Sequence, residues 1–129
     1  MSTANQRQRI DGAVMSGLFR ATRRQALSRE VNENIERLSE EWGAFAGAVS
    51  VLCECGNPGC LERIEVAAAD YEAVRRYPIR FIVKPGHIAG EGERIVREAS
   101  ECVVVEKLGP AAGVAVRLDP RRRAQGATR

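Results

Sequence analysis

The spacing of apolar and polar positions predicts one long helix in the first third of the chain. Five apolar residues recur at steps of four, four, three and four, with charged residues between them. This spacing places them on one face of a helix. We predict a helix over about residues 20–41, ended by Gly43, whose apolar stripe packs on the core of its own domain; a coiled-coil seam for a partner is the alternative. The stripe consists of Leu27, Val31, Ile35, Leu38 and Trp42.

Two short alternating segments predict a β-hairpin after this helix. Apolar and polar residues alternate over residues 49–53 and again over residues 63–66. Between the segments lies the sequence Gly56-Asn57-Pro58-Gly59, a dense turn signal. We therefore predict two antiparallel strands whose turn carries three cysteines.

The rest of the chain alternates between helical and strand-like patterns. Residues 68–77 are predicted to form a helix that stops before Pro78. Two apolar runs predict strands at 80–84 and 102–106, with a short helix over about 91–99 between them. Residues 110–118 fit a helix or a strand equally well. These elements indicate an α+β fold: an amphipathic N-terminal helix, a small, mostly antiparallel sheet that includes the hairpin with the three cysteines, and one or two short helices.

Length and composition indicate one globular domain. The chain has 129 residues, of which 44% are hydrophobic and 29% are charged. Residues 1–17 and 120–129 lack apolar periodicity, so we expect a flexible N-terminus, a single domain over 18–119 and a basic flexible tail. No apolar run would span a bilayer, and the first residues do not resemble a secretory signal. We therefore expect a cytoplasmic protein with reduced thiols.

The cysteine spacing in the predicted hairpin points to a metal site. Cys53, Cys55 and Cys60 follow the pattern C-x-C-x4-C. Two cysteines that lie two residues apart on an extended segment point to the same face. The turn then reverses the chain and brings the third cysteine back. Zn²⁺ favours tetrahedral thiolate and imidazole ligands, so this knuckle predicts a structural zinc site.

A closed zinc site needs a fourth ligand, and the sequence leaves three choices. His87, the only histidine, follows the third predicted strand in a Pro85-Gly86-His87 turn and is the favoured ligand. Cys102 starts an apolar strand, where a cysteine more often packs as a small apolar residue. A water molecule is the third choice. Free thiols, a redox pair or an iron–sulfur cluster are alternatives to zinc itself.

Two resemblances attach to these residues. The C-x-C-G-x3-C pattern resembles the post-SET zinc motif of lysine methyltransferases over eight residues, without any SET-type catalytic sequence. A wider stretch, about residues 29–121, resembles a family of small bacterial proteins from GC-rich soil organisms whose activity is unassigned. In that family three cysteines and a histidine recur together, which implies that His87 is the fourth ligand. Segments carrying this resemblance include 29–33, 62–65, 85–87, 103–107 and 119–121.

Charge and site chemistry leave three function classes open. The favoured class is a non-catalytic regulatory or interaction module with an unidentified protein partner. A nucleic-acid-binding module is the alternative, because Arg-rich ends bracket an acidic segment. A zinc-dependent hydrolase is third, with Glu54 or Glu62 as a candidate general base. The candidate nucleic-acid contacts are Arg20, Arg23, Arg24, Arg121, Arg122 and Arg123.

Overall fold

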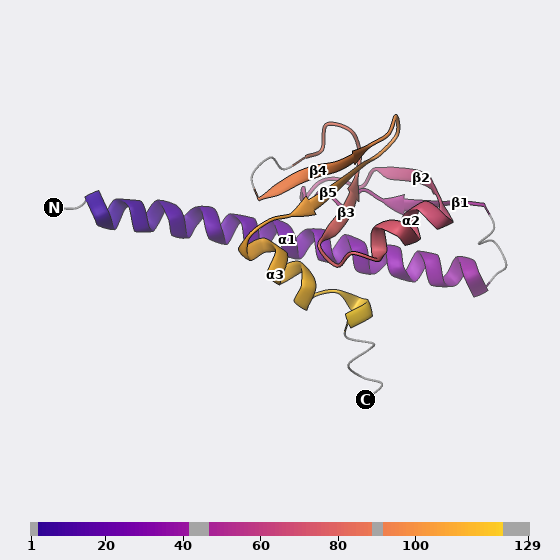
Figure 1. Ribbon diagram of the computed structural model, residues 1–129, viewed down its shortest axis with the longest axis horizontal. Coiled ribbons are helices and arrows are strands. Elements are labelled where there is room, and N and C mark those ends of the chain that lie inside the picture. Colours follow the sequence, from indigo (N-terminus) through magenta and orange to yellow (C-terminus); the bar gives the residue numbers. More distant parts are fainter. Residues whose placement is uncertain (1–2, 42–46, 89–91, 123–129) are drawn as a thin grey trace.

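The computed structural model describes residues 3–41, 47–88 and 92–122, and within the first helix the side chains of residues 17–38. The elements that these residues form give an α+β fold, as predicted: one long helix, two small antiparallel sheets and two short helices of eight residues each (Figure 1). The helices are α1 (Thr3–Glu41), α2 (Ala68–Arg75) and α3 (Pro110–Arg117). The strands are β1 (Ala48–Leu52), β2 (Arg63–Ala67), β3 (Arg80–Val83), β4 (Glu93–Glu98) and β5 (Val103–Lys107).

The five strands form two antiparallel sheets. The predicted hairpin is present, with β1 paired to β2 so that Val51 lies opposite Ile64. The second sheet has the order β3-β5-β4, which makes β5 its central strand. All five residues of β5 are buried, in keeping with its apolar Val103-Val104-Val105 run. Both faces of this strand are covered, so its residues need not alternate between apolar and polar.

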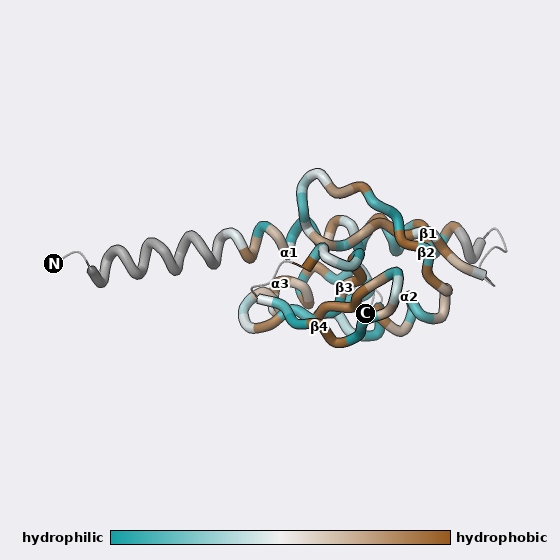
Figure 2. Tube along the Cα trace, turned by 90° about the horizontal axis from the view of Figure 1, so that it is seen from above, coloured by the Kyte–Doolittle hydropathy of each residue, from teal (hydrophilic) through white to brown (hydrophobic). Residues whose placement is uncertain are grey.

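An apolar core joins the two sheets. Its members come from both sheets, from α2 and α3, and from the segment that follows β1; β-branched residues dominate. Figure 2 shows this distribution, since the strongly hydrophobic segments lie mainly on the strands. The largest fully buried apolar side chains of the core are Tyr71, Phe81, Ile64, Ile82 and Val51. Two of the core residues, Cys53 and Cys55, also belong to the predicted metal site.

The long helix α1 packs on the domain with the face opposite to the predicted one. Its buried residues are polar or small, while Leu27, Val31 and Leu38 are 63%, 44% and 49% exposed. Ile35 is half-buried, and Trp42 lies outside the described residues. The prediction that the apolar stripe packs on the domain's own core is therefore wrong. The buried face consists of Thr22, Gln25, Ala26, Arg29, Asn32 and Glu36.

The polar face of α1 is buried because each long side chain finds a partner in the body of the domain. Arg29 donates to the carbonyl oxygens of Pro78 at 2.5 Å and Ala115 at 2.9 Å, and its guanidinium lies 4.5 Å from the centre of the Phe81 ring. Asn32 donates to the carbonyl of Leu52 and accepts from its N–H. Buried polar groups that are satisfied in this way stabilise a unique packing.

Three further predictions about elements need correction or completion. Residues 93–98 form strand β4 and not a helix; Ile95 and Val96 are β-branched, and the strand pairs with β5. The ambiguous segment 110–118 is a helix, α3, with Pro110 in its first turn. Helix α1 begins at Thr3, well before residue 20, because its first residues include good helix formers that show no apolar periodicity.

Within the described part of the chain, no helix combines the length and the apolar composition needed to cross a bilayer. Figure 1 shows α1 running beneath both sheets, with its N-terminal part extending past the body of the domain. Helix α3 lies against α1 and β5, and α2 lies against β2 and β3.

Candidate metal centre

The three knuckle cysteines are placed by the end of the β1–β2 hairpin. The N–H of Cys53 donates to the carbonyl of Glu62 at 2.8 Å, which continues the pairing one step beyond the strands. The N–H of Cys60 donates to the carbonyl of Asn57 at 3.0 Å and closes a turn. Gly56 has a φ of +77°, a conformation that favours glycine. The chain therefore reverses tightly and returns Cys60 to the side of Cys53.

His87 reaches the same place from the loop after β3. Its N–H donates to the carbonyl of Lys84 at 3.0 Å, and Gly86 adopts a φ of +85° in the turn between them. The N–H of Lys84 donates to the Sγ atom of Cys53 at 3.2 Å. The loop is thus tied directly to a cysteine sulfur, and this contact brings two segments 31 residues apart together.

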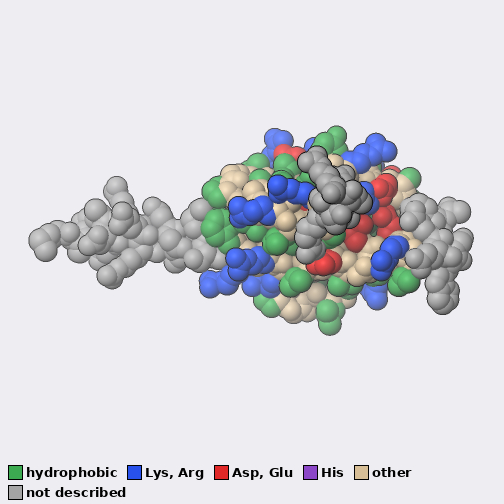
Figure 3. All heavy atoms as spheres, turned by 90° about the horizontal axis from the view of Figure 1, so that it is seen from below, with side chains coloured by type: hydrophobic (Ala, Val, Ile, Leu, Met, Phe, Trp, Pro, Cys, Tyr) green, Lys and Arg blue, Asp and Glu red, His purple; other side chains and the backbone are tan. Residues whose placement is uncertain are grey.

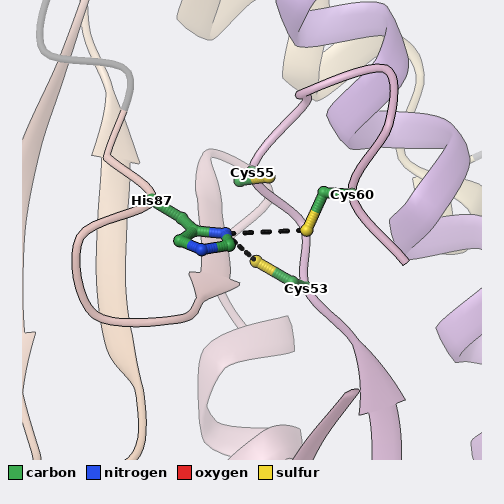
Figure 4. Close-up of side chains that lie close together, drawn as sticks. All are labelled: Cys53, Cys55, Cys60 and His87. Carbon is green, nitrogen blue, oxygen red and sulfur yellow. Dashed lines mark hydrogen bonds between the residues drawn. The ribbon is translucent and has the colours of Figure 1, made fainter. Parts of the chain in front are cut away.

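The four predicted ligand atoms converge (Figure 4). One ligand atom from each of Cys53, Cys55, Cys60 and His87 lies within 4.8 Å of every other one. The Nδ1 atom of His87 lies 3.6 Å from Cys53 Sγ and 3.5 Å from Cys60 Sγ. A tetrahedral zinc with ordinary Zn–S and Zn–N distances has S–N edges of about 3.6 Å. The group can therefore hold a metal ion with little rearrangement.

The other ring nitrogen of His87 has its own partner. Nε2 lies 3.1 Å from the Oε2 atom of Glu62, the residue just before β2. A metal-ligating histidine usually donates its second N–H to a carboxylate or a carbonyl, which fixes the ring and its tautomer. The Glu62 carboxylate is placed to accept the N–H of Nε2. The Nδ1 atom then remains free of a proton and faces the sulfurs.

Glu54 lies between two of the cysteines but faces away from them into the domain. Its side chain is fully buried, and burial raises its pKa. Oε1 accepts from the N–H of Ile82 at 2.9 Å. Oε2 accepts from Asn32 Nδ2 at 2.8 Å and from the Tyr71 hydroxyl at 3.0 Å. Glu54 therefore clamps the knuckle to β3 and α1, an arrangement that does not suit a general base.

Burial also affects the cysteine thiols. It raises the pKa of Cys53 to about 12, although the Lys84 N–H acts in the opposite direction. Burial likewise raises the pKa of Cys55. Without a cation these thiols stay protonated near neutral pH, and a metal ion would have to displace their protons. Metal affinity at this group is therefore expected to rise with pH.

Helix α1 covers one side of the knuckle. A Cβ atom built on Gly56 would lie 2.8 Å from the carbonyl oxygen of Ala21, so the close approach requires glycine. Arg24 Nε donates to the Gly56 carbonyl at 2.6 Å. A cavity of about 450 Å³ opens beside this contact, and its wall includes Cys55 and His87. Solvent can therefore reach the metal group from one side.

Cys102 lies apart from this group. It stands just before β5 and lines a small cavity of about 60 Å³ with apolar neighbours that include Val66, Val74 and Ile82. Among the residues that the structure describes, the group that can hold a metal consists of the three knuckle cysteines and His87. The geometry thus favours His87 over Cys102 as the fourth ligand.

The six candidate nucleic-acid arginines differ in their surroundings. Arg20, Arg23 and Arg122 are exposed, and Arg123 lies outside the described residues. Arg24 is half-buried against the knuckle. Arg121 contacts three carboxylates, those of Glu33 at 2.7 Å, Glu72 at 2.6 Å and Glu36 at 3.1 Å. Its charge is therefore directed at the domain itself, while nucleic-acid binding by the others stays a prediction.

Two residues that support the site, Glu62 and Asn32, are not identified by the sequence analysis. The sequence suggests Glu62 only as a candidate base, because nothing in its spacing links it to His87, 25 residues later. Asn32 gave a weak signal: asparagine is unfavourable inside a helix, so a buried use of its side chain was to be suspected.

Comparison of the chain with protein-family models, with characterised proteins and with solved structures finds no match in any of the three. The resemblances to the small bacterial proteins and to the post-SET motif therefore stay predictions. What this chain does has to be argued from its own geometry.

Proposed function

We propose that this protein is a small, non-catalytic zinc-binding module that presents a surface to a protein partner. The observation that carries the proposal is the convergence of three cysteine sulfurs and one histidine nitrogen within 4.8 Å. Three thiolates and one imidazole form a donor set that suits Zn²⁺ better than harder cations such as Mg²⁺ or Ca²⁺.

A structural role for the ion follows from what the ligands connect. Cys53 and Cys55 follow β1, Cys60 precedes β2, and His87 belongs to the loop after β3. An ion held by all four would join the two sheets at one end. In a domain of this size such a link contributes substantially to the free energy of folding.

The surroundings of the ligands support a non-catalytic role. A hydrolytic zinc needs an open coordination position and a base beside it. Four protein ligands complete a tetrahedron, Glu54 is buried and hydrogen-bonded away from the sulfurs, and Glu62 lies on the far nitrogen of His87. These contacts leave neither of the two predicted bases in position to activate a water molecule.

The test is the metal content of protein prepared without chelators, measured by native mass spectrometry beside two cysteine variants. We expect one zinc per chain in the wild type, loss of the ion and a large drop in melting temperature for Cys60→Ser, and an unchanged ion for Cys102→Ser. The second variant is the matched control, since Cys102 is a half-buried thiol outside the cluster. Absence of metal from the wild type, or equal loss in both variants, would overturn the proposal.

A further inference from the structure

The outward face of α1 carries an apolar stripe that nothing in the described chain covers. Leu27, Val31 and Leu38 are 63%, 44% and 49% exposed, and half-buried Ile35 lies beside them. Three of the seven large apolar side chains that the described residues expose therefore lie along one short segment. Exposed apolar residues that are gathered in this way indicate a contact surface.

The order of the stripe is nearly the same in both directions. Read from its N-terminal end, the stripe has a leucine, two β-branched residues and a second leucine, at steps of four, four and three. A two-fold axis near residue 33 would bring Leu27 of one chain against Leu38 of another, and Val31 against Ile35. A surface that complements itself in this way fits the isologous contact of a two-fold dimer.

Charge along α1 favours the antiparallel direction. Arg20, Arg23 and Arg24 precede the stripe, whereas the helix ends with the sequence Glu40-Glu41. In an antiparallel pair the basic segment of one chain lies beside the acidic end of the other, while in a parallel pair the exposed Arg20 and Arg23 lie beside the same arginines of the second copy. Figure 3 shows a related separation on the face seen from below: several basic side chains gather near the end from which α1 projects, and most acidic ones lie in the other half.

The surface beside the stripe provides room for a partner side chain. Leu27 lines a hollow of about 250 Å³ together with Ala26 and with Leu118, which follows α3. In the antiparallel arrangement, Leu38 of the second copy lies over this hollow. A knob from one helix that fits between side chains of the other is the usual packing of paired helices.

We infer that this stripe is a dimer interface, in which α1 of one chain pairs antiparallel with α1 of a second copy. The inference rests on the proposed function, since it names the partner that the module presents its surface to. It concerns the face of α1 opposite to the one that packs on the knuckle, so the metal group and the interface can be disrupted separately.

The test compares two glutamate substitutions by light scattering. Val31→Glu changes a stripe residue, and Ile95→Glu changes a residue on β4 of nearly equal exposure, 43% against 44%. We expect wild type and Ile95→Glu to have twice the 14.1 kDa mass of one chain and Val31→Glu the mass of a single chain. A single-chain wild type, or equal dissociation by both substitutions, would overturn the inference.

Cysteine cross-linking tests the direction of the pair. Residues 27 and 38 lie about 16 Å apart along one helix, too far for a disulfide within a chain. The double variant Leu27→Cys/Leu38→Cys is expected to give covalent dimers on oxidation, and Leu27→Cys alone is not. Efficient cross-linking of the single variant would contradict the antiparallel arrangement.

Metal content measured on the same samples separates this inference from the proposed function. A monomeric wild type that binds one zinc overturns the dimer and leaves the zinc module standing. A dimer without metal overturns the zinc module, and Val31→Glu then still decides whether the stripe forms the interface.

Discussion

The core between the two sheets and the contact between α1 and the domain are both buried, but different forces hold them. The core consists of side chains such as Val51, Ile64 and Phe81, which pack without directional bonds. The α1 contact depends on Arg29, Asn32 and other polar groups whose hydrogen bonds are specific in position. An apolar core tolerates exchanges of similar volume, whereas a buried polar group left without its partner is costly. The position of α1 is therefore fixed by a few residues.

The largest effect is expected at Asn32, because it bonds both to the backbone of Leu52 and to the buried carboxylate of Glu54. Asn32→Ala removes the partner of the Leu52 backbone groups and one of the three hydrogen bonds of Glu54, and should lower the free energy of unfolding by about 2–4 kcal/mol. Asn34→Ala, at an exposed position of the same helix, is the control and should change it by less than about 0.5 kcal/mol. Urea denaturation measures both, and equal small effects would show that α1 is held by something other than these bonds.

A second test concerns the ion pairs that join α1 to the C-terminal segment. Arg121 contacts Glu33, Glu36 and Glu72, and Arg121→Ala leaves these carboxylates close together. Because the Arg121 side chain is 30% exposed, solvent reduces the cost to about 1–2 kcal/mol. The neighbouring exposed Arg122→Ala is the control. If thermal unfolding shows the same small loss of stability for both variants, the ion pairs contribute little to the attachment of α1.

The smallest effect is expected at Glu36 and depends on pH. Burial and the nearby carboxylates of Glu72 and Glu33 raise its pKa from 4.5 to about 7. Folding thus favours the protonated form, so this contribution to stability is complete below pH 4.5 and is lost as the pH rises through about 7. Glu36→Gln cannot lose a proton. Its stability relative to wild type should grow by about 1 kcal/mol between pH 5 and pH 6.

The comparison with exposed Glu65→Gln isolates this effect. Glu65 lies on β2 with its side chain in solvent, so its substitution should give a difference from wild type that is nearly constant over the same pH range. A constant difference for Glu36→Gln as well would contradict the raised pKa of Glu36.

The contrast between the two interfaces explains what the sequence could predict. Alternation located β1 and β2, and apolar runs located β3 and the central strand β5, because these strands pack against apolar partners and both patterns reflect burial. The same reasoning found α1 but chose the wrong face, since the stripe at Leu27, Val31 and Leu38 is the exposed one. Apolar periodicity does not predict burial of the polar face of α1, because that burial depends on hydrogen-bond partners in segments that are distant in the sequence.

The metal group was more predictable than the helix face for a physical reason. Three cysteines in one turn must lie close together, so Cys53, Cys55 and Cys60 needed only local geometry. His87 could be predicted as the fourth ligand because it is the only histidine and lies in a turn after a predicted strand. Its contact with Glu62 and the Lys84 N–H on Cys53 depend on how the two sheets meet. The spacing of residues along the chain does not predict how the two sheets contact each other.

X-ray absorption at the zinc edge of the metal-loaded protein tests the central claim most directly, because it counts the donor atoms around the ion. The account predicts three sulfurs at about 2.3 Å and one imidazole nitrogen at about 2.0–2.1 Å. In His87→Ala the imidazole nitrogen should be replaced by an oxygen donor, such as a water molecule, while the three sulfurs stay. A fourth sulfur in the wild type, or a shell made mainly of oxygen, would contradict the Cys3His centre.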